Sequence, residues 1–220
     1  MMRMIKTKDK INLIEDYLDE LYPNAKCELN YKKDYELLIA VVLSAQTTDK
    51  RVNSVTPILF NKYKNLEQLS NALIDDIASI IKPIGTFRKK ASFIKEIARI
   101  LHEDYNDKVP NDRKSLEILP GVGRKTANVV LSNLFDVPAI AVDTHVSRVS
   151  KRLDIVNSSD DVLEIEKKLM NIIDKKNWSK RHHQLVLFGR YKCKAVNPIC
   201  DDCKLRNICK NKRDEKCELE

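Results

Sequence analysis

The sequence predicts an all-α protein, and three observations lead to that fold class. Apolar residues recur every three or four positions in almost every segment, which is the period of an amphipathic helix. No stretch shows the alternation of apolar and polar residues that marks a half-buried strand. Residues that cap helices and prolines that interrupt them fall between the apolar stretches. The pattern therefore predicts about ten short helices in the 220 residues of the chain.

Apolar positions and caps locate the predicted helices in chain order. The apolar positions define helices near residues 11–21, 52–58, 93–100 and 146–153. Asp34, Asp112 and Ser159 are candidate N-caps. The apolar run from Leu37 to Leu43 is too short to cross a membrane, so we expect a buried helix there. Prolines separate the predicted helices at Pro23, Pro83, Pro110 and Pro138.

Composition favours a soluble protein with a polyanionic partner. Hydrophobic residues make up 43% of the chain and charged residues 33%, and no apolar run approaches the roughly 20 residues of a membrane span. No secretory-type apolar core follows the basic N-terminus, so we expect a cytoplasmic location, at the nucleoid in a bacterium. The net charge is +8, with cations dense at Arg88 to Lys90 and at Arg148 to Arg152. This balance indicates nucleic acid, with a merely basic surface as the alternative.

Two of only four glycines stand together in the segment Leu119 to Ala127. Glycine permits positive φ and close approach to the backbone, and a helix that begins near Arg124 adds unpaired N–H groups. Residues 112–118, the turn and a helix to about residue 134 therefore form a helix-hairpin-helix unit that can bind phosphate. An ordinary helical C-cap would explain only one of the glycines. Lys125 is a candidate nucleophile, and the predicted DNA contacts are Gly121, Val122, Gly123, Arg124 and Thr126.

Four of the six cysteines fall in one short segment near the C-terminus: Cys193, Cys200, Cys203 and Cys209. Four thiolates at this spacing can converge on one metal centre. Spacing alone leaves zinc and an iron–sulfur cluster equally open, and a disulfide pair is disfavoured because nothing indicates an oxidising compartment. Outside this group, Cys27 is expected in the core and Cys217 as a free cysteine.

The hairpin and the cysteines, together with the segments Val142 to His145 and Leu43 to Asp49, resemble the endonuclease III family of base-excision repair glycosylases. The resemblance spans most of the chain. It implies two helical lobes with a DNA-binding groove between them, and a 4Fe-4S cluster on the four cysteines. It also implies the domain limits: a six-helix barrel lobe over 27–137 with the hairpin at about 112–134, and a cluster lobe made of 1–26 plus 138–220.

The resemblance also implies the catalytic residues. Lys125 matches the family's catalytic lysine and Asp143 its catalytic aspartate. A glycosylase that cuts the strand needs an amine that attacks the sugar and holds it as a Schiff base. Only a neutral lysine can attack, and both the Arg124 charge and the helix N-terminus disfavour the ammonium form. Asp143 is expected to assist lysine deprotonation. His145 is expected to support the site as a DNA contact, with filling of the helix start as its alternative role. A phosphate contact and a plain N-cap are the alternative roles for Lys125 and Asp143.

Base removal requires the nucleotide to leave the stack, so some side chain must fill the gap. By the resemblance, Gln46 enters the duplex there. A second wedge position follows Ile84 and Gly85, where relatives carry a bulky apolar residue. Here the chain has Thr86 and then Phe87, which leaves the identity of that wedge open.

These observations predict a monomeric repair enzyme that acts on duplex DNA containing damaged bases or abasic sites. It is expected to remove oxidised pyrimidines and to nick the strand by β-elimination. An adenine-mispair DNA glycosylase without lyase activity is one alternative, but that branch lacks the lysine. A non-catalytic iron–sulfur DNA-binding protein is the other, and Lys125 with Asp143 argues against it.

Overall fold

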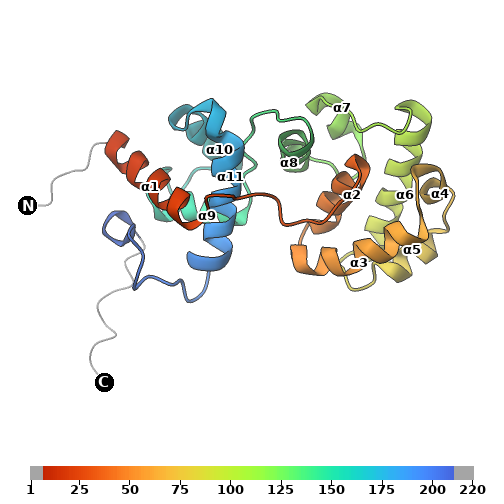
Figure 1. Cartoon of the computed structure of the whole chain (residues 1–220), viewed down its shortest axis with the longest axis horizontal. Coiled ribbons are helices and arrows are strands. Elements are labelled where there is room, and N and C mark those ends of the chain that lie inside the picture. The colour runs from red at the N-terminus through yellow and green to blue at the C-terminus, as the bar shows by residue number, and fades with distance from the viewer. Residues whose placement is uncertain (1–6, 211–220) are drawn as a thin grey trace, which may run out of the picture. The chain divides into compact units, whose positions relative to one another are not determined.

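The computed structural model describes residues 7–210, and every regular element within them is a helix (Figure 1). The predicted all-α class is therefore confirmed. The chain divides into two compact units. We call Cys27–Val137 the hairpin unit, and residues 7–26 together with 138–210 the cysteine unit. No helix in the described part of the chain is long and apolar enough to cross a membrane.

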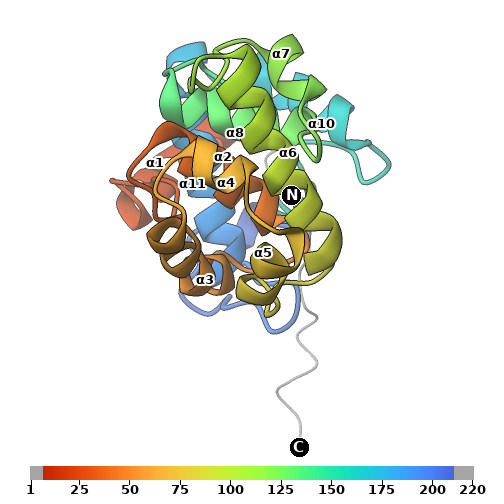
Figure 2. The ribbon, with the colours of Figure 1, turned by 90° about the vertical axis from the view of Figure 1, so that its right-hand side faces the viewer.

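The hairpin unit is built around its longest helix, α6. This helix packs along α4 and α5, as two views of the molecule show (Figure 1, Figure 2). It also contacts α2, which in turn packs on α3 and α8. The helices of the unit are α2 (Asp34–Ser44), α3 (Asp49–Lys62), α4 (Leu66–Ser70), α5 (Ile74–Ile80), α6 (Phe87–Asp104), α7 (Arg113–Ile118) and α8 (Arg124–Leu134).

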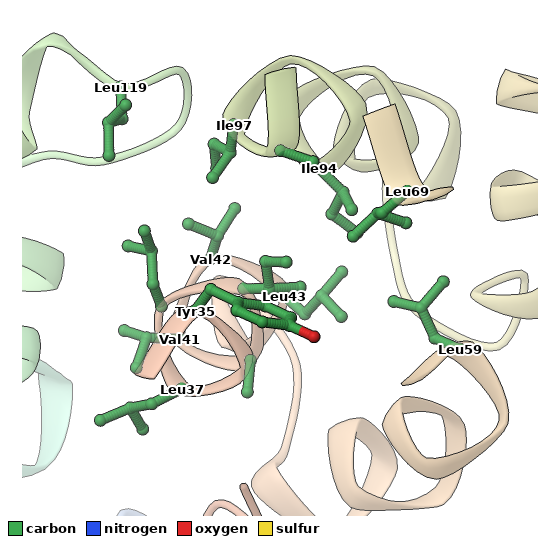
Figure 3. Packing of buried hydrophobic residues seen from close by; sticks show 14 of the residues in the cluster. Tyr35, Leu37, Val41, Val42, Leu43, Leu59, Leu69, Ile94, Ile97 and Leu119 are labelled. Carbon is green, nitrogen blue, oxygen red and sulfur yellow. The ribbon is translucent and has the colours of Figure 1, made fainter. Parts of the chain in front are cut away.

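The core of the hairpin unit surrounds α2, as the apolar run of its sequence predicts. Every residue from Tyr35 to Leu43 is buried, so this helix has no solvent-exposed stripe between those positions. Figure 3 shows Ile94 and Ile97 of α6 and Leu69 of α4 directed toward it. Apart from Glu36, the buried residues of α2 are hydrophobic and lie on all sides of the helix, so α2 is stable only where neighbouring helices cover it.

The cysteine unit joins a helix near the N-terminus to helices more than 120 residues later. Its helices are α1 (Thr7–Leu21), α9 (Thr144–Arg152), α10 (Val162–Ile172) and α11 (Trp178–Leu187). Arg181 of α11 is buried and donates hydrogen bonds to Asp19 of α1 at 2.6 and 3.0 Å. The guanidinium holds the pKa of the Asp19 carboxyl well below its usual range. A charge-assisted, two-pronged contact of this kind fixes both the distance and the orientation of α1 on α11.

The caps of the helices were predicted with mixed success. Asp112 caps α7 as expected, because its Oδ1 accepts a hydrogen bond from Ser115 N at 2.9 Å. Asp34 is instead the first residue of α2, and Lys33 precedes it as the cap residue. Ser159 is not a cap: α10 begins after Asp161, whose carboxylate and Glu164 form a reciprocal capping box.

Candidate functional site

Two buried apolar side chains anchor the hairpin turn, which joins α7 to α8. Leu119 and Val122 are buried at 2% and 6% exposure, and Val122 N donates to Leu119 O at 3.1 Å. Between and after them, Gly121 and Gly123 are exposed. The side chain of Val122 lies in the core and its N–H closes the turn, and the DNA contact predicted for this residue stays a prediction. Val122 therefore anchors the turn while the glycines present the backbone to solvent.

Only one of the two hairpin glycines is required by the backbone. Gly121 has φ of +78°, in the left-handed region, and a Cβ added there would lie 2.6 Å from a ring carbon of Phe93. Gly123 has φ of −104°, and a Cβ there would meet nothing within 4 Å. Gly123 is the N-cap of α8 and supplies no side-chain cap. The uncapped end leaves the first N–H groups of the helix directed toward any bound anion.

Gly121→Ala is expected to lower the free energy of unfolding by about 2–4 kcal/mol, because it combines left-handed strain with overpacking against Phe93. Gly123→Ala is the matched control and should cost under about 1 kcal/mol, since its backbone is extended and its surroundings are open. Urea unfolding of both variants measures the difference. Equal losses at the two positions would contradict the geometry described for the turn.

Lys125 is the second residue of α8, and its side chain is exposed. Arg124 before it is also exposed, whereas Thr126 is half-buried. The first turn of α8 thus carries two adjacent cations at an uncapped helix start.

Asp143 lies in the cysteine unit and is the N-cap of α9. Its Oδ1 accepts a hydrogen bond from Val146 N at 2.8 Å, and Oδ2 accepts none from a described residue. The four residues before it, Ala139 to Val142, are all buried, so the backbone that leads to the carboxylate is firmly held. One carboxylate oxygen therefore stabilises the helix while the other remains available.

His145 and Arg148 occupy the first turns of α9 and form a contact that the sequence did not predict. His145 packs so closely on the backbone of Gly189 that a Cβ there would lie 2.8 Å from the His145 Cβ. Arg148 donates to Gly189 O at 2.6 Å and lies 3.2 Å from His145 Nδ1. Burial lowers the pKa of Arg148 from its ordinary value. His145 is thus held by contacts with Gly189 on one side and Arg148 on the other.

Arg152, one turn after Arg148, joins α9 to the segment that begins the cysteine cluster. Both arginines donate to the carbonyl oxygen of Cys193, and Arg152 Nη1 lies 3.4 Å from the Cys193 sulfur. Arg152 also donates to Lys194 O at 2.6 Å. In the sequence these arginines were visible only as a local excess of charge. Their spacing of four residues, which places them on one face of the helix that Asp143 caps, was the available signal.

The four cysteines of the cluster lie in the cysteine unit and form no disulfide. Three of them, Cys193, Cys203 and Cys209, pack against the apolar core of that unit, and burial raises the pKa of the Cys203 thiol. Among the described residues, no group of three or more His, Cys, Asp or Glu side chains is arranged to hold a metal ion. Cys27 packs against the core of the hairpin unit as predicted, and Cys217 lies outside the described residues.

The two candidate wedges lie at exposed turns of the hairpin unit. Gln46 follows α2 and Thr86 precedes α6; both are exposed and have positive φ, at 57° and 56°. Phe87 is half-buried against the core, with the Arg88 guanidinium 5.0 Å from its ring centroid. Of the two residues after Gly85, Thr86 is therefore the one whose side chain is available to a partner.

An exposed glycine turn before an uncapped helix, on an all-helical unit, defines a helix-hairpin-helix protein. The chain belongs to the HhH-GPD superfamily of base excision DNA repair proteins, whose family model matches residues 39–175, and within it to the endonuclease III family. The matched range contains the hairpin, Lys125 and Asp143.

The chain is similar over most of its length to endonuclease III of several bacteria. The enzyme of Bacillus subtilis (strain 168) is 50% identical over 209 residues, which are 94% of this chain and 95% of the relative. A solved non-covalent endonuclease III–DNA complex has a TM-score of 0.90 and 49% identity, covering 94% of this chain and 96% of its own. A trapped endonuclease III–DNA covalent intermediate has a TM-score of 0.89 and 49% identity, with 94% and 97% covered.

Proposed function

We propose that this protein is a bifunctional DNA glycosylase and abasic-site lyase that removes oxidised pyrimidines from duplex DNA. The observation that carries the proposal is the exposed Lys125, in the first turn of an uncapped helix directly behind the Gly121 turn. That position combines an amine with backbone donors suited to a phosphate. The likeness to an endonuclease III trapped as a covalent intermediate with DNA supports a covalent nucleophile, and Lys125 is the amine that this site offers.

In the proposed reaction, the neutral Lys125 amine attacks the anomeric carbon of the damaged nucleotide and displaces the base. The bond from that carbon to the base nitrogen breaks, and the base leaves with the electron pair. The sugar ring then opens: the bond from the anomeric carbon to the ring oxygen breaks, the oxygen takes up a proton and stays on the sugar as a hydroxyl, and the nitrogen lone pair forms a protonated Schiff base, which acidifies the neighbouring sugar proton. Removal of that proton expels the 3′ phosphate, and water then releases Lys125. Asp143 assists deprotonation of the amine and stabilises positive charge on the sugar.

The DNA backbone is held, in this proposal, by the hairpin turn and the first turn of α8. Gly121 and Gly123 let the phosphate approach the main chain, and Arg124 and Thr126 flank it. Gln46 fills the gap that the extruded nucleotide leaves. We infer that the protein works in the cytoplasm, at the nucleoid in a bacterium.

Excision from duplex oligonucleotides tests the function and separates it from the alternatives. The protein should release thymine glycol and leave a nicked strand. An adenine-mispair glycosylase would instead release adenine opposite an oxidised guanine without nicking. A non-catalytic DNA-binding protein would release neither base. Release of thymine glycol without a nick would refute the lyase half of the proposal.

We propose further that the four cysteines hold a 4Fe-4S cluster. Their donor set is entirely thiol, as such clusters require. A zinc ion can bind the same four thiolates, and membership of the endonuclease III family is what favours the cluster. The cluster would fix residues 193–209, where the only regular element is the short turn Arg206–Ile208.

Metal analysis of the purified protein tests the cluster directly. The protein should be brown, with a visible sulfur-to-iron absorption band and about four iron atoms per chain. Cys203→Ser should lose the band and most of the iron, whereas Cys27→Ser, in the other unit, should retain both. A colourless protein that contains zinc would overturn the assignment.

A further inference from the structure

The turn that follows α2 holds Gln46 in a conformation that a glutamine disfavours. Thr47 N donates to Ser44 O at 3.1 Å, which closes a four-residue turn. Its central residues are Ala45, with φ −57° and ψ 120°, and Gln46, with φ 57°. These angles define a type II turn, whose third position normally requires glycine or asparagine. Rotation of the Ala45–Gln46 peptide would give a type I turn, in which Gln46 has a negative φ and no strain.

Lys90 of α6 binds the peptide that distinguishes the two turn types. Its side chain is buried, and Nζ donates to Ala45 O at 2.5 Å and to Leu43 O at 2.9 Å. The Ala45 carbonyl belongs to the central peptide of the turn, so a hydrogen bond to it holds that peptide in the type II orientation. Burial lowers the pKa of Lys90, and the carbonyls at the negative end of α2 compensate the charge. An isolated lysine would not be placed there without these acceptors.

The residues that precede α6 also contact the turn that contains Gln46. A Cβ added to Gly85 would lie 4.0 Å from Gln46 O, so the backbone of Gly85 approaches the turn closely. Thr86 follows with its own positive φ, and its carbonyl accepts from Lys90 N at 3.1 Å. One residue, Lys90, thus binds the Gln46 turn through its side chain and the Thr86 turn through its backbone.

We propose that Lys90 is a positioning residue that sets the direction of the Gln46 side chain by holding its turn in the strained type II form. The proposal rests on the proposed function, in which Gln46 enters the duplex when a base is extruded. A glutamine held in advance loses little freedom on insertion, so removal of Lys90 should slow the extrusion and excision of the base rather than the initial binding of DNA.

A double-mutant cycle tests the proposal. Single-turnover release of thymine glycol from a duplex is measured for wild type, Lys90→Met, Gln46→Ala and the double variant. We expect Lys90→Met to slow excision roughly tenfold, the size of effect that a strained residue supports. In the Gln46→Ala background the same change should have almost no further effect, since no Gln46 side chain remains to be positioned. Equal slowing in both backgrounds would show that Lys90 only stabilises the fold.

Two further variants separate a specific effect of Lys90 from the general loss of a cation and from a failure to fold. Lys95→Met removes a half-buried cation from the same helix away from the turn, and should leave excision unchanged. Should Lys90→Met fail to fold, Lys90→Gln retains a neutral donor and enters the same cycle. If the wild-type protein releases no thymine glycol, the proposed function fails and this inference with it. If the wild type is active and the cycle is additive, only the role of Lys90 is refuted.

Discussion

Lys125→Ala is expected to form no covalent adduct with abasic-site DNA when borohydride is added, and to lose strand nicking by at least roughly 10³-fold. Borohydride reduces the Schiff base and so records the amine that carried the sugar. Alanine has no amine, and the side chain of Lys125 is exposed, so the substitution should leave the fold intact. Gel electrophoresis of the trapped species and denaturant unfolding of the variant measure the two effects separately.

Lys114→Ala is the matched control for this experiment. Lys114 is an exposed lysine of α7, in the same helix-hairpin-helix unit, and its removal should leave adduct formation close to that of the wild type. Trapping by Lys125→Ala at the wild-type level would remove Lys125 from the mechanism and leave it as a phosphate contact.

Asp143→Asn is expected to slow turnover roughly 100-fold while the free energy of unfolding changes by less than about 1 kcal/mol. Asparagine caps helices as well as aspartate does, so the hydrogen bond from Val146 N survives. What is lost is the negative charge that assists the amine and the developing positive charge of the sugar. Single-turnover excision, DNA affinity and urea unfolding distinguish these contributions, and affinity should be nearly unchanged.

Asp161→Asn provides the comparison for a residue that only caps. Asp161 accepts from Glu164 N at 2.8 Å at the start of α10, as Asp143 does at the start of α9. Its replacement should affect stability as little as that of Asp143 and should leave turnover unaffected. A normal rate for Asp143→Asn would mean that Asp143, like Asp161, is no more than a cap.

The parts of the site that were predictable depend on short-range chemistry. Asp112 and Asp143 each precede a helix directly and accept a hydrogen bond from the backbone N–H three residues later, so their positions follow from the local sequence. The start of α8 at Arg124 was predicted for the same reason and is confirmed. Ser159 failed because Asp161 and Glu164 together satisfy two backbone groups, which a single serine cannot match.

The parts that were not predictable depend on contacts between distant segments. Lys90 reaches carbonyls 45 and 47 residues earlier, and Arg148 reaches Cys193 across 45 residues. In the sequence, Lys90 and Arg148 cannot be told apart from the other cations of the basic stretches in which they lie. Their roles are defined only when a second helix supplies acceptors that no local rule specifies.

The separation of α1 from its partners determines when each half of the molecule can fold during synthesis. All of the hairpin unit lies between residues 27 and 137, so it can fold as soon as it leaves the ribosome. Asp19 is synthesised 162 residues before Arg181, with which it pairs, and Glu20 is synthesised 184 residues before its partner Lys204. Helix α1 is therefore synthesised first but is among the last helices to pack against its partners. The cysteine unit can complete its fold only after its cysteines have been synthesised.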